Sequence, residues 1–379
     1  MLLDVLENGH DIGALPLMLN RLPLLCVAAM LGLTSPTLAQ EGPPQQVECD
    51  GSVVKGFESV VTGCASASID RQILINNADV LSKVVAGSFH LGPPSIAPAG
   101  LAEMTVEEAQ ARLAGGSSFL IAPTADVAVA APSPKWNIWI DGKYTWNDNS
   151  PANFNLDGPL WNGLAGVDYK LTDKFTLGII GSFESSNLDG TGVDTKSTGW
   201  GGGAYMGFLL TDNVVFSANV LGTSIDSSQS GFFDFNSERL QAAAALNGYW
   251  YNDTWRFTPG LSVSWSKEWI EETSGFAPDQ TVEVALLTPS IQVGDTLRLS
   301  DTATVEPWAG AALDWTLVNK IKPSGLTSID DPNVDARLQA GFNFGFGSNA
   351  QFSLTGEIGG LLLDTINTYS GEANLAFQF

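Results

Sequence analysis

The sequence predicts an all-β fold: a twelve-stranded antiparallel transmembrane β-barrel with a short, partly helical amino-terminal extension. From Lys135 onward, short segments alternate apolar and polar side chains, as strands do when lipid covers one face and water the other. All 11 Trp and all 6 Tyr lie between Trp136 and Tyr369, which suits the two aromatic belts of such a barrel. Short and long connections also alternate along this region.

The last nine residues alternate most simply, with Phe377 and Phe379 on one face and Gln378 on the other. A chain that ends in mid-strand leaves an open sheet edge unless that strand pairs with the first one. We therefore expect the strand from Thr365 to close the barrel against the strand that begins at Trp136. Regular alternation places other strands at 136–143, 175–184, 255–265, 305–315, 334–344 and 351–362, and weaker patterns at 160–170, 198–210, 214–224, 238–251 and 281–296.

The connections between these strands indicate which end of the barrel is which. Outer-membrane barrels have short periplasmic turns, longer external loops and an even number of strands that returns both chain ends to the periplasm. The sequence therefore predicts a protein of the cell outer membrane with its external loops at the cell surface. Short turns are expected at 171–174, 211–213, 252–254 and 347–349, and long loops at 147–159, 187–197, 225–237, 270–280 and 318–333. The tight connection near Asp364 departs from this alternation.

Proline within three of the strands, at 259, 289 and 307, lacks the N–H group that a strand interior donates. A bulge or a strand end is therefore expected at each of these positions.

Charged side chains fall on the strand face opposite the apolar one, which points them into the lumen. A water-soluble sandwich would also alternate, but it would not need one face with almost no charge and another that is strongly charged. We expect these residues to solvate a channel or to hold a helix within it. The predicted lumen-facing residues are Lys143, Glu184, Arg239, Arg256, Glu306, Arg337, Glu357 and Glu372.

Residues 1–39 are predicted to be a secretory signal peptide that is cleaved after Ala39, with Met18 as a possible true start. Arg21 precedes an apolar run from Leu22 to Leu33, which is too short to span a membrane as a helix.

Residues 40–116 are predicted to form a short passenger-like region, joined to the barrel at 135–379 by a linker at 117–134. Cys49 and Cys64 could form a disulfide in an oxidising compartment, or remain as two buried thiols. A capping-box pattern at Thr105–Glu108 predicts a helix over 105–114. Residues 53–85 show no clear repeat, so a small disulfide-pinned unit is possible there.

The composition argues against several classes of function. A net charge of -24, from 41 acidic and 17 basic residues, excludes a nucleic-acid partner. The two histidines, His10 and His90, lie outside the barrel, and the barrel has no Gly-x-Ser-x-Gly motif. We therefore expect no enzyme activity, no metal site and no cofactor.

Several motifs together resemble the β-domain of autotransporters, the proteins of type V secretion. They are Pro134–Trp146 (PKWNIWIDGKYTW), Gly163–Asp173 (GLAGVDYKLTD), Leu177–Gly181 (LGIIG), Phe257–Trp265 (FTPGLSVSW), Val305–Pro307 (VEP) and the terminal Phe379. This resemblance implies a monomeric translocator in the outer membrane of a Gram-negative cell, which carries its own amino-terminal passenger to the surface. It also implies Sec-dependent export, contact with outer-membrane lipid, and an assembly signal at Phe377 and Phe379 that the barrel-assembly machinery reads.

Two features depart from that family. Only about 95 residues separate the signal peptide from the barrel, and the predicted helix at 105–114 is distant from Trp136, whereas the pore helix of the family leads almost directly into the first strand. Asn76-Asn77 resembles the cleavage junction of some relatives, although a turn or a cap explains it as well. A barrel without a passenger, acting as a structural or adhesive surface protein or as a diffusion pore, therefore remains an alternative.

Overall fold

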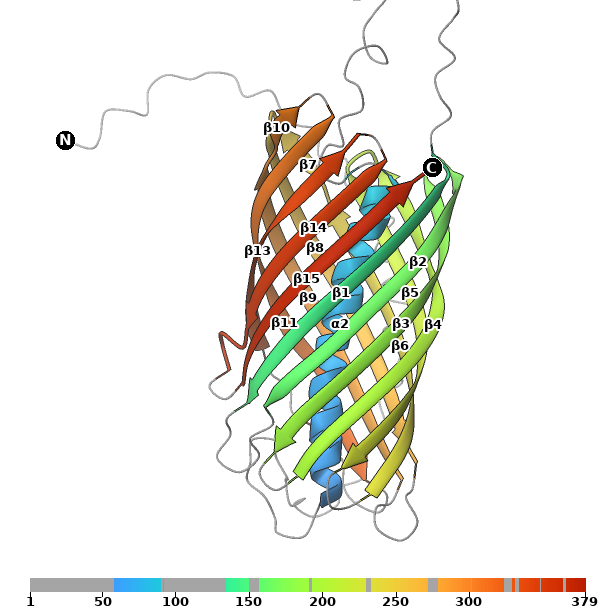
Figure 1. Ribbon diagram of the computed structural model, residues 1–379, viewed down its shortest axis with the longest axis vertical. Coiled ribbons are helices and arrows are strands. Elements are labelled where there is room, and N and C mark those ends of the chain that lie inside the picture. Colours follow the sequence, from blue (N-terminus) through green and yellow to red (C-terminus); the bar gives the residue numbers. More distant parts are fainter. Residues whose placement is uncertain are drawn as a thin grey trace, which may run out of the picture. The chain divides into compact units, whose positions relative to one another are not determined.

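A closed antiparallel barrel surrounds one long helix in the computed structural model (Figure 1). The structure describes residues 58–89, 91, 134–149, 157–190, 193–229, 233–271, 279–300, 302–323, 329–330, 334–347, 349–363 and 366–379. The predicted signal peptide, Cys49, the helix at 105–114 and the linker up to residue 133 lie outside the described residues.

Twelve long strands form the wall of the barrel, as the sequence predicted. They are β1 (Trp136–Asn149), β2 (Gly158–Thr172), β3 (Phe175–Gly190), β4 (Val193–Thr211), β5 (Val214–Gln229), β6 (Phe233–Gly248), β8 (Trp255–Ile270), β9 (Gln280–Asp295), β11 (Ala303–Pro323), β13 (Val334–Phe346), β14 (Ala350–Gly359) and β15 (Ile366–Gln378). Short pieces continue or border them: β7 (Trp250–Asn252), β10 (Leu297–Ser300) and β12 (Ile329–Asp330). The helix in the lumen is α2 (Glu58–Ser88).

The barrel closes where the last strand meets the first. β15 pairs with β1 along its whole length, with Phe377 opposite Ile138. The terminal residue extends this seam, because the Phe379 N–H donates to the Trp136 carbonyl at 2.9 Å and the Trp136 N–H donates to the Phe379 carbonyl at 3.0 Å. The carboxyl-terminal strand therefore leaves no open edge.

The strands extend further than the sequence predicted at the end of the barrel opposite the carboxyl terminus. The loops expected at 187–197 and 225–237 are mostly paired strand: Asp189 lies opposite Asp194, and Ser228 lies opposite Asp234. These segments are rich in Ser, Asp and Thr, so they lack the contrast between apolar and polar faces. That contrast needs lipid on one side, and it fades where water reaches both faces of a strand.

The prediction of a bulge or strand end at each proline was wrong. The strands run through all three prolines without a change of register. The missing N–H instead interrupts pairing to one neighbour, because β6 and β7 are separate pieces opposite Pro259, and β9 and β10 are separate opposite Pro307. The bonds between β9 and β11 are likewise interrupted beside Pro289.

Outward-facing aromatic residues lie at two levels of the wall. On β8, Trp255 and Trp265 are about 33 Å apart along the strand, which is about 25 Å along the axis of a tilted barrel and matches the apolar band of such proteins. The level near the carboxyl terminus includes Trp136, Tyr169, Phe175, Phe208, Trp255, Phe257, Phe377 and Phe379. The other level, called here the loop-end belt, includes Tyr144, Trp146, Trp161, Phe183, Trp200, Trp265, Trp269, Trp315 and Tyr369.

Helix α2 was not predicted from the sequence. It has 31 residues, or about 46 Å of helix, and its side chains are buried or half-buried from Gly63 to Phe89. A helix enclosed on all sides has no water-facing stripe, so the periodicity that usually reveals an amphipathic helix is absent. Among the described residues, no helix, α2 included, is both long and apolar enough to cross a lipid bilayer.

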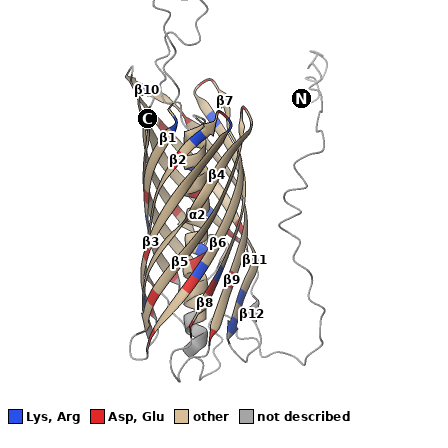
Figure 2. Cartoon of the chain, turned by 90° about the vertical axis from the view of Figure 1, so that its right-hand side faces the viewer, with Lys and Arg blue, Asp and Glu red and all other residues tan. Residues whose placement is uncertain are grey.

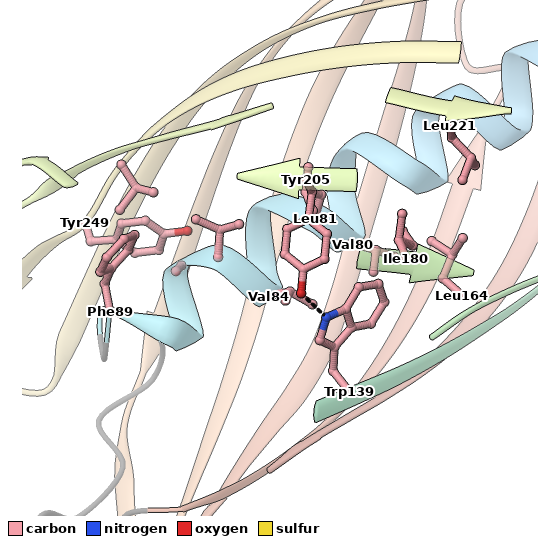
Figure 3. Packing of buried hydrophobic residues seen from close by; sticks show 13 residues of the cluster. Val80, Leu81, Val84, Phe89, Trp139, Leu164, Ile180, Tyr205, Leu221 and Tyr249 are labelled. Carbon is pink, nitrogen blue, oxygen red and sulfur yellow. Dashed lines mark hydrogen bonds between the residues drawn. The ribbon is translucent and has the colours of Figure 1, made fainter. Parts of the chain in front are cut away.

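Apolar contacts hold α2 against different parts of the wall in its two halves. Near its amino end, Leu74 and Ile75 pack against β6, β8, β9 and β11, and Ile69 and Ile73 pack against β2 and β3. Near its carboxyl end the helix packs against β1 to β5 and Tyr249 instead (Figure 3). The residues of this second cluster are Val80, Leu81, Val84, Val85, Ala86, Phe89, Trp139, Leu164, Ile180, Tyr205, Val215, Leu221 and Tyr249.

Candidate functional site: the filled lumen

Arg239 of β6 is the centre of an ionic cluster that joins α2 to the wall. Its guanidinium donates to Asp70 of α2 at 2.6 Å and to Glu184 of β3, and it lies 4.0 Å from Glu268 of β8. Ser266 donates to the other carboxylate oxygen of Asp70 at 3.0 Å. The four charged groups are buried, so each depends on the others to offset the loss of water.

Arg337 of β13 organises a second cluster further along the helix. It donates to Asp314 at 2.6 Å, to Glu357 at 2.5 Å and to Asp79 of α2 at 3.2 Å. Lys143 of β1 reaches the same Glu357 at 2.9 Å. One helix residue is thereby connected to four strands of the wall: β1, β11, β13 and β14.

Contacts with the closing strand hold the carboxyl half of α2. Lys83 forms an ion pair with Glu372 of β15, and the Gln378 side chain donates to the Gly87 carbonyl at 2.6 Å. Asn374 of the same strand donates to Asp141 of β1 at 3.3 Å. The strand that closes the barrel therefore also binds the helix inside it.

A chain of hydrogen bonds reaches the last residue of the helix, at the end of the barrel where the carboxyl terminus lies. The Trp139 indole N–H donates to the Tyr205 hydroxyl at 2.6 Å (Figure 3). Tyr205 in turn donates to Asp168 at 2.6 Å. The hydroxyl of Ser88, the last residue of α2, donates to the other oxygen of Asp168 at 3.0 Å. Gly178 lies directly under the Tyr205 ring, where any Cβ would meet it at 2.4 Å.

Asn76 and Asn77 lie in the middle of α2, not in a turn or at a cap. Asn76 donates to Asn162 of β2, and Asn77 donates to Gln241 of β6 at 3.0 Å. Both side chains are buried between the helix and the wall.

The lumen is not completely filled beside the carboxyl half of α2. The helix packs against β1 to β5 there, and a cavity of about 100 Å³ remains on its other side. Polar side chains line much of it, among them Asp79, Lys83, Arg256, Asn343, Gln351 and Gln378. Its size suits a few water molecules.

The eight predicted lumen residues are all buried. Figure 2 shows where charged residues fall along the strands and α2. Six of the eight belong to the clusters around α2, whereas Arg256 and Glu306 pair with each other at 2.7 Å on the wall. Phe377 and Phe379 face outward with 47% and 61% of their surface exposed. Cys64 is disulfide-bonded, and Cys49, its predicted partner, lies outside the described residues.

Several charged residues of the site were missed. Period-two alternation could have placed Asp141, Glu268 and Asp314 in the lumen, because each lies between outward-facing neighbours on its strand. No sequence signal reveals Asp70, Asp79 and Lys83, since their role depends on a helix whose burial hides its pattern.

The comparison with known families agrees with this geometry. A model of the autotransporter β-domain family matches residues 138–357, which is more than half of the chain. The chain belongs to the autotransporter β-domain family. A translocator barrel of the outer membrane is therefore its functional class.

Solved autotransporter domains share the fold of this one. The β-domain of the Bordetella autotransporter Brka has a TM-score of 0.51 at 14% identity, covering 65% of this chain and 100% of that chain. The transport unit of the autotransporter AIDA-I from Escherichia coli has a TM-score of 0.51 at 12% identity, covering 78% of this chain and 99% of that chain. At such identities the likeness concerns the fold alone. Curated protein sequences give no match.

Proposed function

We propose that this autotransporter barrel delivers the chain that precedes α2 to the cell surface and anchors it there, with α2 left in the lumen as a plug. The proposal rests on the direction in which α2 runs through the barrel. Its carboxyl end lies beside the terminal strand, through the bond from Gln378 to Gly87, and beside the short turn after β7, through the bond from Tyr251 to Leu91.

The amino end of α2 lies at the opposite mouth of the barrel. Gly63 lies against Ile321 and Gln280, which are near the ends of β11 and β9 furthest from the carboxyl terminus. If the short turns face the periplasm, as in outer-membrane barrels generally, the chain before α2 leaves the lumen on the cell surface.

The proposed partners follow from this route. Sec-dependent export would bring the chain to the periplasm, the barrel-assembly machinery would read Phe377 and Phe379, and outer-membrane lipid would surround a monomeric barrel. The proposed role is display rather than catalysis, since autotransporter translocator barrels are generally not enzymes. A diffusion pore receives less support, because α2 occupies the lumen.

A protease-sensitive tag tests the proposed route. Inserted after Gln40, the tag should be cut by protease added to intact cells, because the chain before α2 lies outside. The same tag inserted between Asp212 and Asn213, in the turn between β4 and β5, should be protected. Protection of the first tag until the outer membrane is permeabilised would contradict surface delivery.

A further inference from the structure

Helix α2 fills the lumen completely at its middle and incompletely toward its carboxyl end. Six consecutive residues, Ile73 to Ala78, are all buried. Because six residues make about 1.7 turns of helix, every face of α2 is covered over this stretch. Further along, Asp79, Ser82 and Lys83 are half-buried and line the cavity beside the helix.

Apolar and amide contacts surround the covered stretch on most sides. Ile73 packs in the cluster on β2 and β3, and Leu74 and Ile75 pack in the cluster on β6, β8, β9 and β11. The next two side chains, Asn76 and Asn77, donate hydrogen bonds to β2 and β6. Gaps between apolar side chains do not hold water. These contacts therefore exclude a hydrated path along the helix on these sides.

The ionic cluster around Arg337 closes the side of the lumen that faces β1, β13 and β14. Arg337 lies between Asp79 of the helix and two carboxylates of the wall, Asp314 and Glu357. Lys143 reaches Glu357 from the other side. The four wall residues of this cluster are all buried. Together with the apolar clusters, they complete a ring of contacts around the middle of α2.

The cavity beside the carboxyl half of α2 reaches the mouth of the barrel where the carboxyl terminus lies. Its lining includes Gln378, the last residue of β15, and Gln351, near the start of β14. Both side chains are half-buried, as is Ser290 of β9, which also lines the cavity. The cavity extends inward as far as Asp79. Its amide and hydroxyl groups bind water, so water enters it from this mouth.

We propose that the ring of contacts around Ile73–Ala78, called here the central seal, is what closes the pore. The cavity is then a vestibule, which solutes enter from one mouth without passing the seal. Contacts of the carboxyl half, such as that of Lys83 with Glu372, hold the helix but do not block passage. This inference rests on the proposed function only in that α2 remains in the lumen, and not on which mouth faces the cell surface.

Two cysteine variants on one strand test the central seal. Leu286 and Ser290 both face inward on β9, about 13 Å apart along the strand. Leu286 is fully buried in the cluster that holds Leu74, whereas Ser290 lines the vestibule. The full chain, purified in detergent, is treated with iodoacetamide, a small water-soluble thiol reagent that reaches both mouths. Mass spectrometry of the intact chain follows alkylation, and the wild type, with its 3 cysteines, gives the background.

The two positions should differ strongly in rate. Ser290→Cys should react readily, because water fills the vestibule. Leu286→Cys should react at least about a hundredfold more slowly, because its reaction must wait for local opening of the packed interior. In a chain that lacks residues 58–89, both cysteines should react at similar rates, since α2 no longer covers either of them. Heat-modifiable migration shows that each variant is folded.

Three results would overturn the proposal, and the first two need only the full chain. Equal reaction at both positions would mean that no seal exists at the middle of α2. Protection of Ser290→Cys as strong as that of Leu286→Cys would mean that the vestibule is closed. Continued protection of Leu286→Cys without α2 would mean that the wall, and not the helix, excludes the reagent. Each of these results is compatible with an exposed tag after Gln40, so this proposal and surface delivery fail separately.

Discussion

At the scale of single residues, Arg239 has the most demanding position in the lumen. It is buried among three carboxylates that come from α2, β3 and β8. Its guanidinium is the cation that offsets the negative charge of all three. A buried ion pair contributes little net stability compared with a well-packed apolar pair, but removing one partner leaves an uncompensated charge. The wall and the helix are therefore interdependent at this point.

The substitution Arg239→Met tests that dependence. It should destabilise the folded protein by about 3–5 kcal/mol, because Asp70, Glu184 and Glu268 would remain buried without their cation. The measurement is the urea midpoint of unfolding, at constant slope. Adding Asp70→Asn, Glu184→Gln and Glu268→Gln to Arg239→Met should restore much of the loss. An unchanged midpoint for Arg239→Met would contradict the account of the cluster.

The residues of the wall were more predictable than those of the helix. Alternation assigns Lys143 or Glu357 to a face of its strand without knowledge of any partner, because the side-chain period of a strand is two. It cannot say that the two meet, since β1 and β14 are adjacent only through the closing strand between them. Ion pairing in the lumen is a property of the closed barrel rather than of any one strand.

At the scale of elements, α2 depends on a close approach to the wall. Gly207 of β4 faces inward, and a Cβ at this position would lie 2.2 Å from Val85 and 3.3 Å from Phe89. A larger residue at Gly207 would push the carboxyl half of the helix toward the cavity on the other side.

Gly207→Val should therefore lower the melting temperature of the folded protein, because overpacking of a filled interior costs about 1–3 kcal/mol. Gly222→Val is the matched control, since a Cβ at Gly222 of β5 meets nothing within 4 Å. The comparison is made by thermal unfolding of both variants in the same detergent. Equal melting temperatures of the two variants would show that α2 does not pack against Gly207.

The strands and the helix differ in how much their sequence reveals. Each wall strand separates lipid from water, so its two faces differ in polarity and the element can be recognised, as in β8 from Trp255 onward. Helix α2 is enclosed by the barrel on all sides, and its neighbours change along its length. They are apolar at Leu74, ionic at Asp79 and apolar again at Val85. Because these neighbours are mixed, the helix sequence has no regular spacing of apolar residues. The helix is therefore recognised only in the structure, where the barrel encloses it.

At the scale of the whole molecule, the barrel and α2 form one unit with a direction. The carboxyl terminus, the start of β1, the short turns and the carboxyl end of α2 share one mouth, and the extended hairpins and the amino end of α2 share the other. Three apolar clusters and two ionic clusters hold the helix in this direction along its length. This arrangement agrees with the proposal that α2 is the last segment to be translocated and that it remains in the pore.

Single-channel conductance in a planar lipid bilayer tests this claim most directly. The full chain should conduct little, because α2 and its contacts fill the lumen apart from a small cavity. A variant that lacks residues 58–89 should form stable channels of much larger conductance, since the twelve-stranded wall would then enclose open water. Equal conductance from the full chain and from the folded deletion variant would contradict the conclusion that α2 closes the pore.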